Sequence, residues 1–470
     1  MKRFAVFSLA FATLWLAACS SRSRPNIILI VVDTLRPDRL GAYDRTRGLT
    51  PFLDSFAQRA HVFANAYAPT SWTNASIASL LTSRYQSQHR VLSFQAAMSD
   101  QEITLTQVLK EHGYATGGFS ANFLLRADLG FGRGFDAYRT LGRIEKDAAD
   151  RPQFVKDRAD KLNREALAWL DELASAHRPM PPVFLYLHYM EPHNPYDPPA
   201  ELLDKILGGR ARPDREAVNQ RMRLPNLGTF SDEFVQDVQD LYDAEVMSLD
   251  GDLRQLFDGL RARGVLDDAL VVITADHGEE FREHGLMGHH QTLYEEVLRI
   301  PLLISLPGQE RRVDVERIVS LVDLAPTLLD LAGIPPPPAF MGHSVRPLLR
   351  RRAGWWPFGD RDGATPLTGP GMTFSELIMD PTARQRPHER AVVAGTHKLI
   401  VDVDGGREFY DLRADPSEAN PQALGDAERA ELVAAVEQLQ GFGRPAPSAK
   451  TPAQVDSETR ERMRALGYAE

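Results

Sequence analysis

Three runs of apolar, mostly β-branched residues stand out along the chain because polar residues do not alternate within them. They are residues 26–32, 182–187 and 269–274. Uninterrupted runs of this length are typical of central parallel strands that are covered on both faces. Asp33, His188 and the pair Asp276 and His277 follow these runs. Polar side chains in such places are expected to gather at one edge of an open α/β sheet.

Two stretches between these runs have helical periodicity. Their apolar faces are formed by Val155, Ala159, Leu162, Ala166, Trp169 and Leu173 in the first, and by Phe234, Val238, Leu241, Leu249, Leu253, Leu256 and Leu260 in the second. Ser231 is expected to cap the start of the second helix. The alternation of strands and helices predicts an α/β fold with a doubly wound, mainly parallel sheet and helices on both faces.

Proline and glycine punctuate the last third of the chain. Pro335–Pro338 and Gly354–Gly371 precede a region in which residues 391–400 and 407–412 resemble strands. Residues 441–452 are expected to form a linker. We therefore predict three units, namely a core domain over residues 25–355, a small C-terminal α+β subdomain over 356–445, and a linker with a tail helix over 446–470.

The N-terminus has the pattern of an exported lipoprotein. Two basic residues precede an apolar segment, residues 4–16, which is too short to span a bilayer comfortably. The sequence Leu16-Ala-Ala-Cys19 resembles the lipobox of bacterial lipoproteins, whose cysteine is diacylated and becomes the first mature residue. Residues 1–18 are therefore predicted to be a signal peptide. Residues 19–24 are predicted to be a lipidated tether that holds the protein on a membrane through Cys19.

Lipidation places the expected location in the bacterial cell envelope, facing the periplasm. Ser20 and Ser21 follow the cysteine, which favours the outer membrane. The alternative interpretation is a plain signal peptide with an accidental cysteine. Cys19 is the single cysteine of the chain, so disulfides within the chain are excluded.

Composition and charge exclude one class of partner. The 470 residues are 43% hydrophobic and 25% charged, as in ordinary globular proteins. The formal net charge is -10, and no basic block stands out. Affinity for nucleic acid comes from clustered lysine and arginine, so no nucleic-acid partner is expected.

Asp33, Asp276 and His277 form, together with Thr73, a set that suits a divalent metal ion. Two carboxylates and an imidazole leave room for a further oxygen ligand, which a hydroxyl group can provide. Coordination lowers the pKa of that hydroxyl and makes it a nucleophile. Each residue alone also has a structural interpretation, because aspartate often forms turns and histidine often lies in a core.

Longer motifs point to a family. They are residues 24–41, Thr50-Pro-Phe-Leu-Asp54, Phe63-Ala-Asn-Ala-Tyr-Ala68, Asp276-His-Gly-Glu-Glu280, Glu283-His-Gly285, Leu293-Tyr-Glu-Glu296, residues 299–304, residues 323–329, Lys398-Leu-Ile400, Tyr410-Asp-Leu412, Asp415-Pro416 and Leu466-Gly-Tyr468. Together they span nearly the whole mature chain and resemble the sulfatase family of the alkaline phosphatase superfamily. The resemblance implies an alkaline-phosphatase-like fold and a metal-dependent esterase-type activity.

The chain departs from the sulfatase signature at its reactive residue. Sulfatases carry Cys-x-Pro-x-Arg or Ser-x-Pro-x-Arg ahead of a Leu-Leu-Thr-Gly-Arg segment, and the cysteine becomes formylglycine. Here residues 79–84 read Ser-Leu-Leu-Thr-Ser-Arg, which places Thr73-Asn-Ala-Ser-Ile77 in the signature. Threonine cannot become formylglycine, so the chain resembles the threonine-nucleophile members that act on phosphoryl esters. Ser71 and Ser76 are rival hydroxyls outside this register.

The resemblance assigns Asp33, Asp276 and His277 as metal ligands and Thr73 as the nucleophile that also contacts the metal. Thr34 replaces the second carboxylate of the Asp-Asp pair that binds calcium in many sulfatases. The loss of one hard anionic ligand favours manganese or zinc, with calcium and magnesium as the alternatives.

The resemblance also assigns the polar residues around the metal. His193 corresponds to the histidine that binds the transferring group, and His289 or His290 to the residue that contacts the substrate oxyanion or leaving group. Asn74 is expected to bind a phosphoryl oxygen. His89 and Asn122 are interpreted first as structural residues.

The functional hypothesis is a metal-dependent hydrolase or transferase that attacks phosphoryl esters with Thr73 and forms a covalent phosphoenzyme. One alternative is a sulfuric ester hydrolase of the arylsulfatase type that works without formylglycine. Another is an envelope-binding module without catalysis. The expected partners are a phosphate- or sulfate-ester substrate and a membrane, and no motif names the substrate itself.

Overall fold

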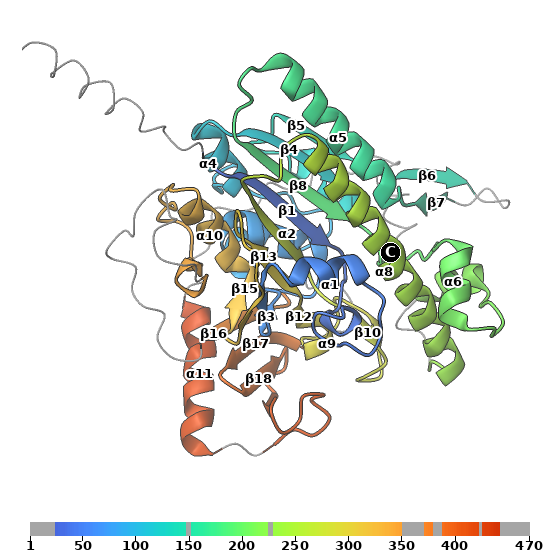
Figure 1. Ribbon diagram of the computed structural model, residues 1–470. Helices are drawn as coiled ribbons and strands as arrows, with labels where there is room; N and C mark the ends of the chain where they lie inside the picture. Colours follow the sequence, from blue (N-terminus) through green and yellow to red (C-terminus); the bar gives the residue numbers. More distant parts are fainter. Residues whose placement is uncertain are drawn as a thin grey trace, which may run out of the picture.

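An eight-stranded mixed sheet runs through the middle of the molecule, as the computed structural model in Figure 1 shows. The described residues are 24–146, 152–223, 229–349, 371–378, 388–422 and 425–441. In spatial order the strands are β14 (Val313–Val315), β2 (His61–Phe63), β13 (Leu302–Ser305), β9 (Ala269–Ala275), β1 (Asn26–Val32), β8 (Val183–Tyr189), β4 (Ala115–Ser120) and β5 (Ala137–Thr140).

The five strands from β9 to β5 are parallel, and β13 joins them antiparallel. The three apolar runs form the centre: β1 pairs with β8 on one side and with β9 on the other. Val32 lies opposite both Tyr189 and Ala275, so the three central strands end at the same level. This register brings the residues that follow them into one place.

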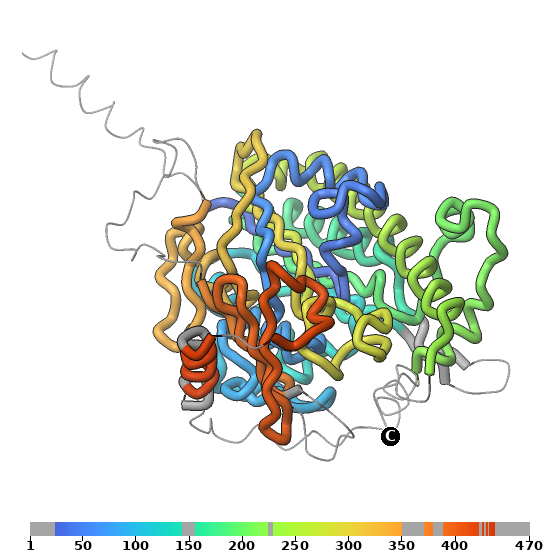
Figure 2. The backbone as a smooth tube through the Cα atoms, turned by 90° about the horizontal axis from the view of Figure 1, so that it is seen from below, coloured from blue at the N-terminus to red at the C-terminus, as the bar shows by residue number. Residues whose placement is uncertain are grey.

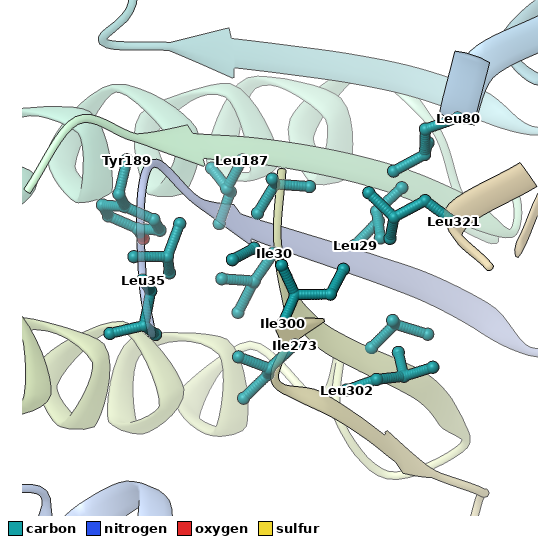
Figure 3. Packing of buried hydrophobic residues seen from close by; sticks show 14 of the residues in the cluster. Leu29, Ile30, Leu35, Leu80, Leu187, Tyr189, Ile273, Ile300, Leu302 and Leu321 are labelled. Carbon is teal, nitrogen blue, oxygen red and sulfur yellow. The ribbon is translucent and has the colours of Figure 1, made fainter. Parts of the chain in front are cut away.

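Helices cover both faces of the sheet, which confirms the predicted fold class. On one side α5 (Ala159–Ala176) packs against α8 (Asp232–Ala262), and Figure 1 shows the two lying together. On the other side α2 (Thr73–Thr82) packs with α4 (Leu105–Glu111) and α10 (Leu324–Leu331). Figure 3 shows Leu80 of α2 and Leu321 close to Leu29 of β1 in the apolar core.

Shorter elements complete the core. The helical ones are η1 (Pro37–Arg39), α1 (Pro51–Ala57), α3 (Gln86–His89), η2 (Phe123–Leu125), η3 (Ala127–Leu129), α6 (Ala200–Leu207), α7 (Arg215–Met222), α9 (Glu295–Leu298), η4 (Leu321–Asp323) and η5 (Arg346–Leu348). The small sheets are β12 (Arg299–Ile300) with β3 (Ala66–Tyr67) and β15 (Val319–Ser320), β10 (Glu280–Phe281) with β11 (Met287–Gly288), and β6 (Arg143–Lys146) with β7 (Pro152–Val155).

A four-stranded antiparallel sheet forms the C-terminal unit. Its strands, in order, are β16 (Met372–Glu376), β17 (His388–Ala394), β18 (His397–Asp402) and β19 (Arg407–Asp411), and α11 (Asp426–Gly441) packs on β17 and β18. The backbone N–H of Glu376 donates to the carbonyl of Pro69, which ties this unit to the core. Figure 2 shows the unit in orange and red beside the yellow segment that follows β9.

Two predicted elements differ in detail from the structure. The first helix starts at Ala159, and Val155 belongs to β7 instead. Its start is fixed from outside the segment, because the Glu191 carboxylate accepts a hydrogen bond of 2.9 Å from the Ala159 N–H. Residues 391–400 form parts of two strands, since Gly395 turns the chain with a φ of 61°. The predicted cap is confirmed: the Ser231 hydroxyl accepts from the Phe234 N–H.

Several expectations fall on residues outside the described ranges. They are the signal peptide over 1–18, the lipidated Cys19 with most of its tether, the boundary near residue 355, and the linker and tail helix over 446–470. These remain predictions, as do the domain boundaries. Among the described residues, no helix combines the length and apolar character that crossing a bilayer requires.

Asp250 of α8 provides a test of how the core is held together. Its carboxylate accepts hydrogen bonds of 2.9 Å from the backbone N–H groups of Phe52 and Leu53 at the start of α1. Asp250→Ala removes both acceptors from a buried place, so we expect a loss of roughly 1–3 kcal/mol in the free energy of unfolding. Urea denaturation at neutral pH measures this loss. Asp258→Ala on the exposed face of α8 is the control, and an equal effect of the two variants would contradict the capping role.

Candidate active site

Asp33 and Asp276 meet at the shared end of the central strands. Asp33 follows β1 and Asp276 follows β9, and the register of these strands places the two residues side by side. His277 comes next in the chain. Ligand atoms of Asp33, Asp276 and His277 all lie within 4.8 Å of one another, and the three side chains have no solvent exposure. The sequence prediction that these residues converge agrees with this geometry.

Thr73 reaches the same place from the first residue of α2. Its Oγ1 lies 3.3 Å from Nε2 of His277. The Ser76 hydroxyl, one turn further on, donates a hydrogen bond of 2.7 Å to the backbone carbonyl of Asp276 and fixes α2 to the end of β9. Ser76 is therefore engaged with the backbone, whereas the Thr73 hydroxyl faces His277.

His277 is oriented by its own backbone neighbourhood. Its Nδ1–H donates a hydrogen bond of 2.9 Å to the carbonyl of Gly278. The lone pair of Nε2 is then available, and this atom lies 3.4 Å from Oδ2 of Asp276 and 3.8 Å from Oδ1 of Asp33. An imidazole whose other nitrogen binds a carbonyl is the usual arrangement of a metal-ligating histidine.

The charge balance of the acidic pair fits a bound cation. Oδ1 of Asp33 and Oδ2 of Asp276 are buried and have no hydrogen-bond partner among the described residues. Burial and the neighbouring charge of Asp33 raise the pKa of Asp276 to about 6. For Asp33, burial raises the pKa, but His193, His188 and His277 together lower it by more. The pKa of Asp33 therefore lies well below the ordinary value. A divalent metal offsets two buried negative charges that otherwise repel each other.

Asn122 joins this centre, although the sequence favoured a structural role for it. Its Nδ2 donates to Oδ2 of Asp33 at 2.6 Å and lies 3.5 Å from Oγ1 of Thr73. Its Oδ1 also accepts a hydrogen bond of 2.8 Å from the backbone N–H of Leu124, so the structural interpretation of Asn122 holds beside this contact with the centre. His188 also contacts Asp33, with Nε2 at 3.4 Å from Oδ2, and its Nδ1 lies 3.1 Å from the hydroxyl of Tyr186.

His289 and His193 lie next to the centre. The ring of His289 is 4.6 Å from that of His277 and 5.0 Å from that of His193. Burial lowers the pKa of His289 to about 3 and that of His193 to about 4, so both are neutral near pH 7. Nδ1 of His289 lies 3.1 Å from Oε1 of Glu279, and burial raises the pKa of Glu279 to about 7.

His290 and Asn74 lie beside these residues in other contacts. The backbone N–H of His290 donates to the carbonyl of Ser71 at 2.9 Å, and its ring packs edge-on against Phe94. The Asn74 amide donates to the carbonyl of Ser93 at 3.0 Å, while its Oδ1 has no partner among the described residues. Their roles in substrate binding remain predictions. His89 is 2.9 Å from Ser79, in agreement with its structural interpretation.

Lys156 is a functional candidate that the sequence did not single out. Its Nζ donates to Oε1 of Glu245 at 2.8 Å and to the backbone carbonyl of His193 at 3.1 Å. All three residues are buried. The ion pair thus fixes the backbone of His193 against α8. The sequence around Lys156 contains no motif from which this contact could be predicted.

A second group of metal-ligand type is closed by its own contacts. It consists of Glu280, His284 and Glu296. Nδ1 of His284 lies 2.7 Å from Oε1 of Glu296, and Nε2 lies 3.3 Å from the carbonyl of Glu418. With an acceptor at each nitrogen, the imidazole of His284 holds two protons. Burial lowers its pKa, but the contact with Glu296 raises the pKa by more, to about 9. Both imidazole nitrogens of His284 are thus engaged with oxygen atoms of the protein.

Comparison with known proteins decides the family. The sulfatase family model matches residues 25–334. This chain belongs to the sulfatase family. It is 24% identical over 92% of its length to an N-acetylglucosamine-6-O-sulfatase of Bacteroides thetaiotaomicron, of which the match covers 90%. The predicted family and the coarse function of a sulfatase-family hydrolase are confirmed.

Two solved structures show the same fold. One, in complex with its substrate D-glucosamine-2-N,6-O-disulfate, has a TM-score of 0.68 and 21% identity, and the match covers 92% of this chain and 100% of that one. The other, a phosphonate monoester hydrolase of Agrobacterium radiobacter, has a TM-score of 0.66 and 21% identity, with 89% and 95% covered. Sulfatase-like folds with different ester specificities therefore resemble this chain about equally.

Metal binding can be tested apart from activity. We expect protein stripped by a chelator to bind a divalent ion through Asp33, Asp276 and His277, with a stabilisation of roughly 2.7 kcal/mol at a hundredfold excess over Kd. Thermal unfolding and calorimetric titration with manganese, zinc, calcium and magnesium measure this.

The matched variants separate the two groups of ligand type. Asp276→Asn is expected to abolish the metal-dependent rise in Tm, whereas Glu280→Gln is expected to keep it. If the metal-dependent rise in Tm survives in Asp276→Asn and disappears in Glu280→Gln, the metal binds at Glu280, His284 and Glu296, and the assignment is contradicted.

Proposed function

We propose that this sulfatase-family protein cleaves phosphoryl esters with Thr73 as the nucleophile. The observation that carries the proposal is the position of Thr73 Oγ1, which lies 3.3 Å from Nε2 of His277 beside two buried carboxylates. The gene supplies a hydroxyl where sulfatases carry a cysteine that is converted after translation. The phosphonate monoester hydrolase among the similar structures has a name that implies a phosphorus-centred reaction, so the shared fold is compatible with one.

The attack uses the hydroxyl of Thr73 and its neighbours. Members of the family generally bind a divalent metal, and in this chain Asp33, Asp276 and His277 would hold it. When bound, the metal lowers the pKa of a coordinated hydroxyl and neutralises charge on the transferring group. Asn122 orients Thr73 by its contact with Oγ1. Thr73 gives its proton to solvent, its oxygen bonds to phosphorus, and the bond between phosphorus and the ester oxygen breaks.

Glu279 and His289 are placed to handle the proton of the leaving group. At pH values below about 7 the Glu279 carboxyl is protonated, because burial raises its pKa to about 7. The Glu279 carboxyl then gives its proton to Nδ1 of His289, 3.1 Å away, as Nε2–H of His289 gives its proton to the departing alkoxide, which leaves Glu279 as a carboxylate. Water, or an acceptor alcohol, subsequently attacks the phosphothreonine and regenerates Thr73.

The start of α2 adds an anion-binding element. Thr73 is the first residue of this ten-residue helix, and the preceding Trp72 provides no side-chain cap. The N–H groups of the first turn therefore lack a capping partner from the N-cap side chain, and the helix dipole favours negative charge there. A phosphoryl group bound to Thr73 would meet these donors.

A sulfate ester is the second candidate substrate, with the same residues acting without formylglycine. The similarity to an N-acetylglucosamine-6-O-sulfatase favours it. Both reactions need the metal centre and differ in the central atom of the ester. Direct comparison of the two substrate classes therefore decides between them.

Activity should depend on the Thr73 hydroxyl. We expect Thr73→Ala to lower turnover by roughly a thousandfold or more, as removal of a covalent nucleophile does, while metal binding and Tm stay near those of the wild type. Thr73→Ser keeps a hydroxyl and should retain measurable turnover. The assay is a panel of aryl phosphate monoesters, phosphodiesters, phosphonates and sulfates, each with manganese, zinc, calcium and magnesium.

Three results would contradict this proposal. Undiminished activity of Thr73→Ala would remove the nucleophile assignment. Turnover of sulfates alone would select the second candidate. A protein that binds no metal and hydrolyses none of the esters would favour a binding module.

Mass spectrometry of acid-quenched protein should detect one added phosphoryl group on the peptide that contains Thr73.

We also propose that the protein is anchored in the bacterial envelope through diacylated Cys19. The basic and apolar residues ahead of the Leu16–Cys19 sequence support this. We expect labelled palmitate to be incorporated into the wild type and the protein to fractionate with membranes. Cys19→Ser should lose the label and appear unprocessed or in the periplasmic fraction. Label on the serine variant, or none on the wild type, would contradict the anchor.

A further inference from the structure

The segment that links β9 to β12 carries His289 and Glu279. We define residues 278–298 as the histidine loop. Its two ends are paired by backbone hydrogen bonds. The N–H of Gly278 donates to the carbonyl of Val297 at 2.9 Å, and the N–H of Glu279 donates to the backbone carbonyl of Glu296 at 3.0 Å. Between them β10 pairs with β11, which places Glu280 opposite Gly288. A shift of residues 295–297 therefore moves Glu279, the partner of His289.

The C-terminal unit holds this loop through a buried lysine. Lys398 of β18 has no solvent exposure. Its Nζ lies 3.1 Å from Oε1 of Glu295 at the start of α9 and 2.9 Å from Oε1 of Glu418. The backbone N–H of Glu295 donates to Oε2 of Glu418 at 2.6 Å, and the Tyr67 hydroxyl donates to Oε2 of Glu295 at 3.1 Å. One cation thus joins two carboxylates from separate parts of the chain.

His284 and Tyr294 provide a second connection between the same two parts. His284 bridges Glu296 of the loop and the backbone carbonyl of Glu418. Its ring stacks on that of Tyr294 with 3.5 Å between centroids. The Tyr294 hydroxyl in turn donates to Oε2 of Glu408 on β19 at 3.1 Å. The end of the loop is therefore held to the C-terminal unit at several points.

The motif around Asp415 builds the turn that presents Glu418. The Asp415 carboxylate accepts from the N–H groups of Ala419 and Asn420 at 3.2 and 2.9 Å. Glu418 itself has a φ of 51°, in the left-handed region that glutamate rarely adopts. A non-glycine residue is held in such a conformation only where its surroundings fix it. The Lys398-Leu-Ile and Asp415-Pro motifs thus have a common structural purpose.

These contacts have an energetic reason to be specific. A buried lysine loses its hydration and is stable only with carboxylates in good geometry, so a displaced Glu295 or Glu418 leaves a charge unpaired. Apolar packing would tolerate sliding of the loop over the C-terminal sheet. The ionic contact at Lys398 permits one arrangement.

We propose that Lys398 is a positioning residue, which holds the Glu279–His289 pair in register with the Asp33, Asp276 and His277 centre through Glu295 and Glu418. The inference rests on the proposed function, because it assigns to that pair the proton of the leaving group. It extends the active site to the C-terminal unit, which the family match over residues 25–334 does not include.

The test compares Lys398→Met with Lys398→Arg and with Lys110→Met. Lys110 forms an ion pair with Asp136 and is about half exposed, at 48%, so it controls for the loss of a lysine. A misplaced proton donor slows esters with poor leaving groups most. We expect Lys398→Met to lower kcat roughly tenfold or more for an alkyl ester and less for a nitrophenyl ester. KM should change little, and Lys398→Arg should restore most of kcat.

Hydrogen exchange provides a readout that does not need turnover. We expect backbone amides of residues 278–298 to lose protection roughly tenfold in Lys398→Met, while amides of β1 and β9 keep theirs. If Lys398→Met does not fold, Glu418→Gln keeps the side-chain volume and removes one charge, and the same two readouts apply to it.

The outcomes separate this inference from the proposed function. An equal loss of kcat for good and poor leaving groups, or unchanged protection of the histidine loop, would overturn the positioning role. A wild type without phosphoryl turnover would contradict the proposed function and leave the exchange experiment to decide on the contacts of Lys398. Full activity of Lys398→Met beside an inactive Thr73→Ala would refute only the inference.

Discussion

The repulsion between two buried carboxylates is the constraint on which the site depends. Asp33 and Asp276 lie together because β1 and β9 are parallel neighbours whose ends coincide. Neither sheet geometry nor burial relieves their charge, and one oxygen of each lacks a partner among the described residues. A cation held by Asp33, Asp276 and His277 would offset this charge. His277 and Thr73 lie around the same point, with 3.3 Å between Nε2 and Oγ1, and could provide further ligands.

The surrounding polar residues are arranged as supports for that centre. Asn122 and His188 contact the second oxygen of Asp33, and Ser76 binds the backbone of Asp276. Lys156 fixes the backbone of His193 against α8. Asp33, Asp276 and His193 are thus each held by a neighbouring side chain, as accurate positioning of a site requires.

The sequence revealed the parts of the site that follow strong strands. Asp33 and Asp276 end apolar runs that can be recognised without a structure, but Asn122 follows β4, whose two glycines disguise it. Gly117 is required because a Cβ there would lie 2.6 Å from a ring atom of Trp169. The contacts of Lys156 and Lys398 could not be found in this way, although Lys398 lies in a motif, because Glu245 and Glu295 lie 89 and 103 residues away from them. Such contacts depend on the assembled fold and leave no local pattern.

The place of Lys398 and Glu418 in the chain bears on when the histidine loop acquires its shape. A ribosome adds these residues after the whole eight-stranded sheet has been made. A nascent chain, or one that lost its last quarter to a protease, would contain every residue of the proposed active site and still lack the contacts of Glu295 with Lys398 and Glu418. The histidine loop is therefore fully held only after the C-terminal unit has been synthesised. A fragment that lacks this unit lacks those contacts.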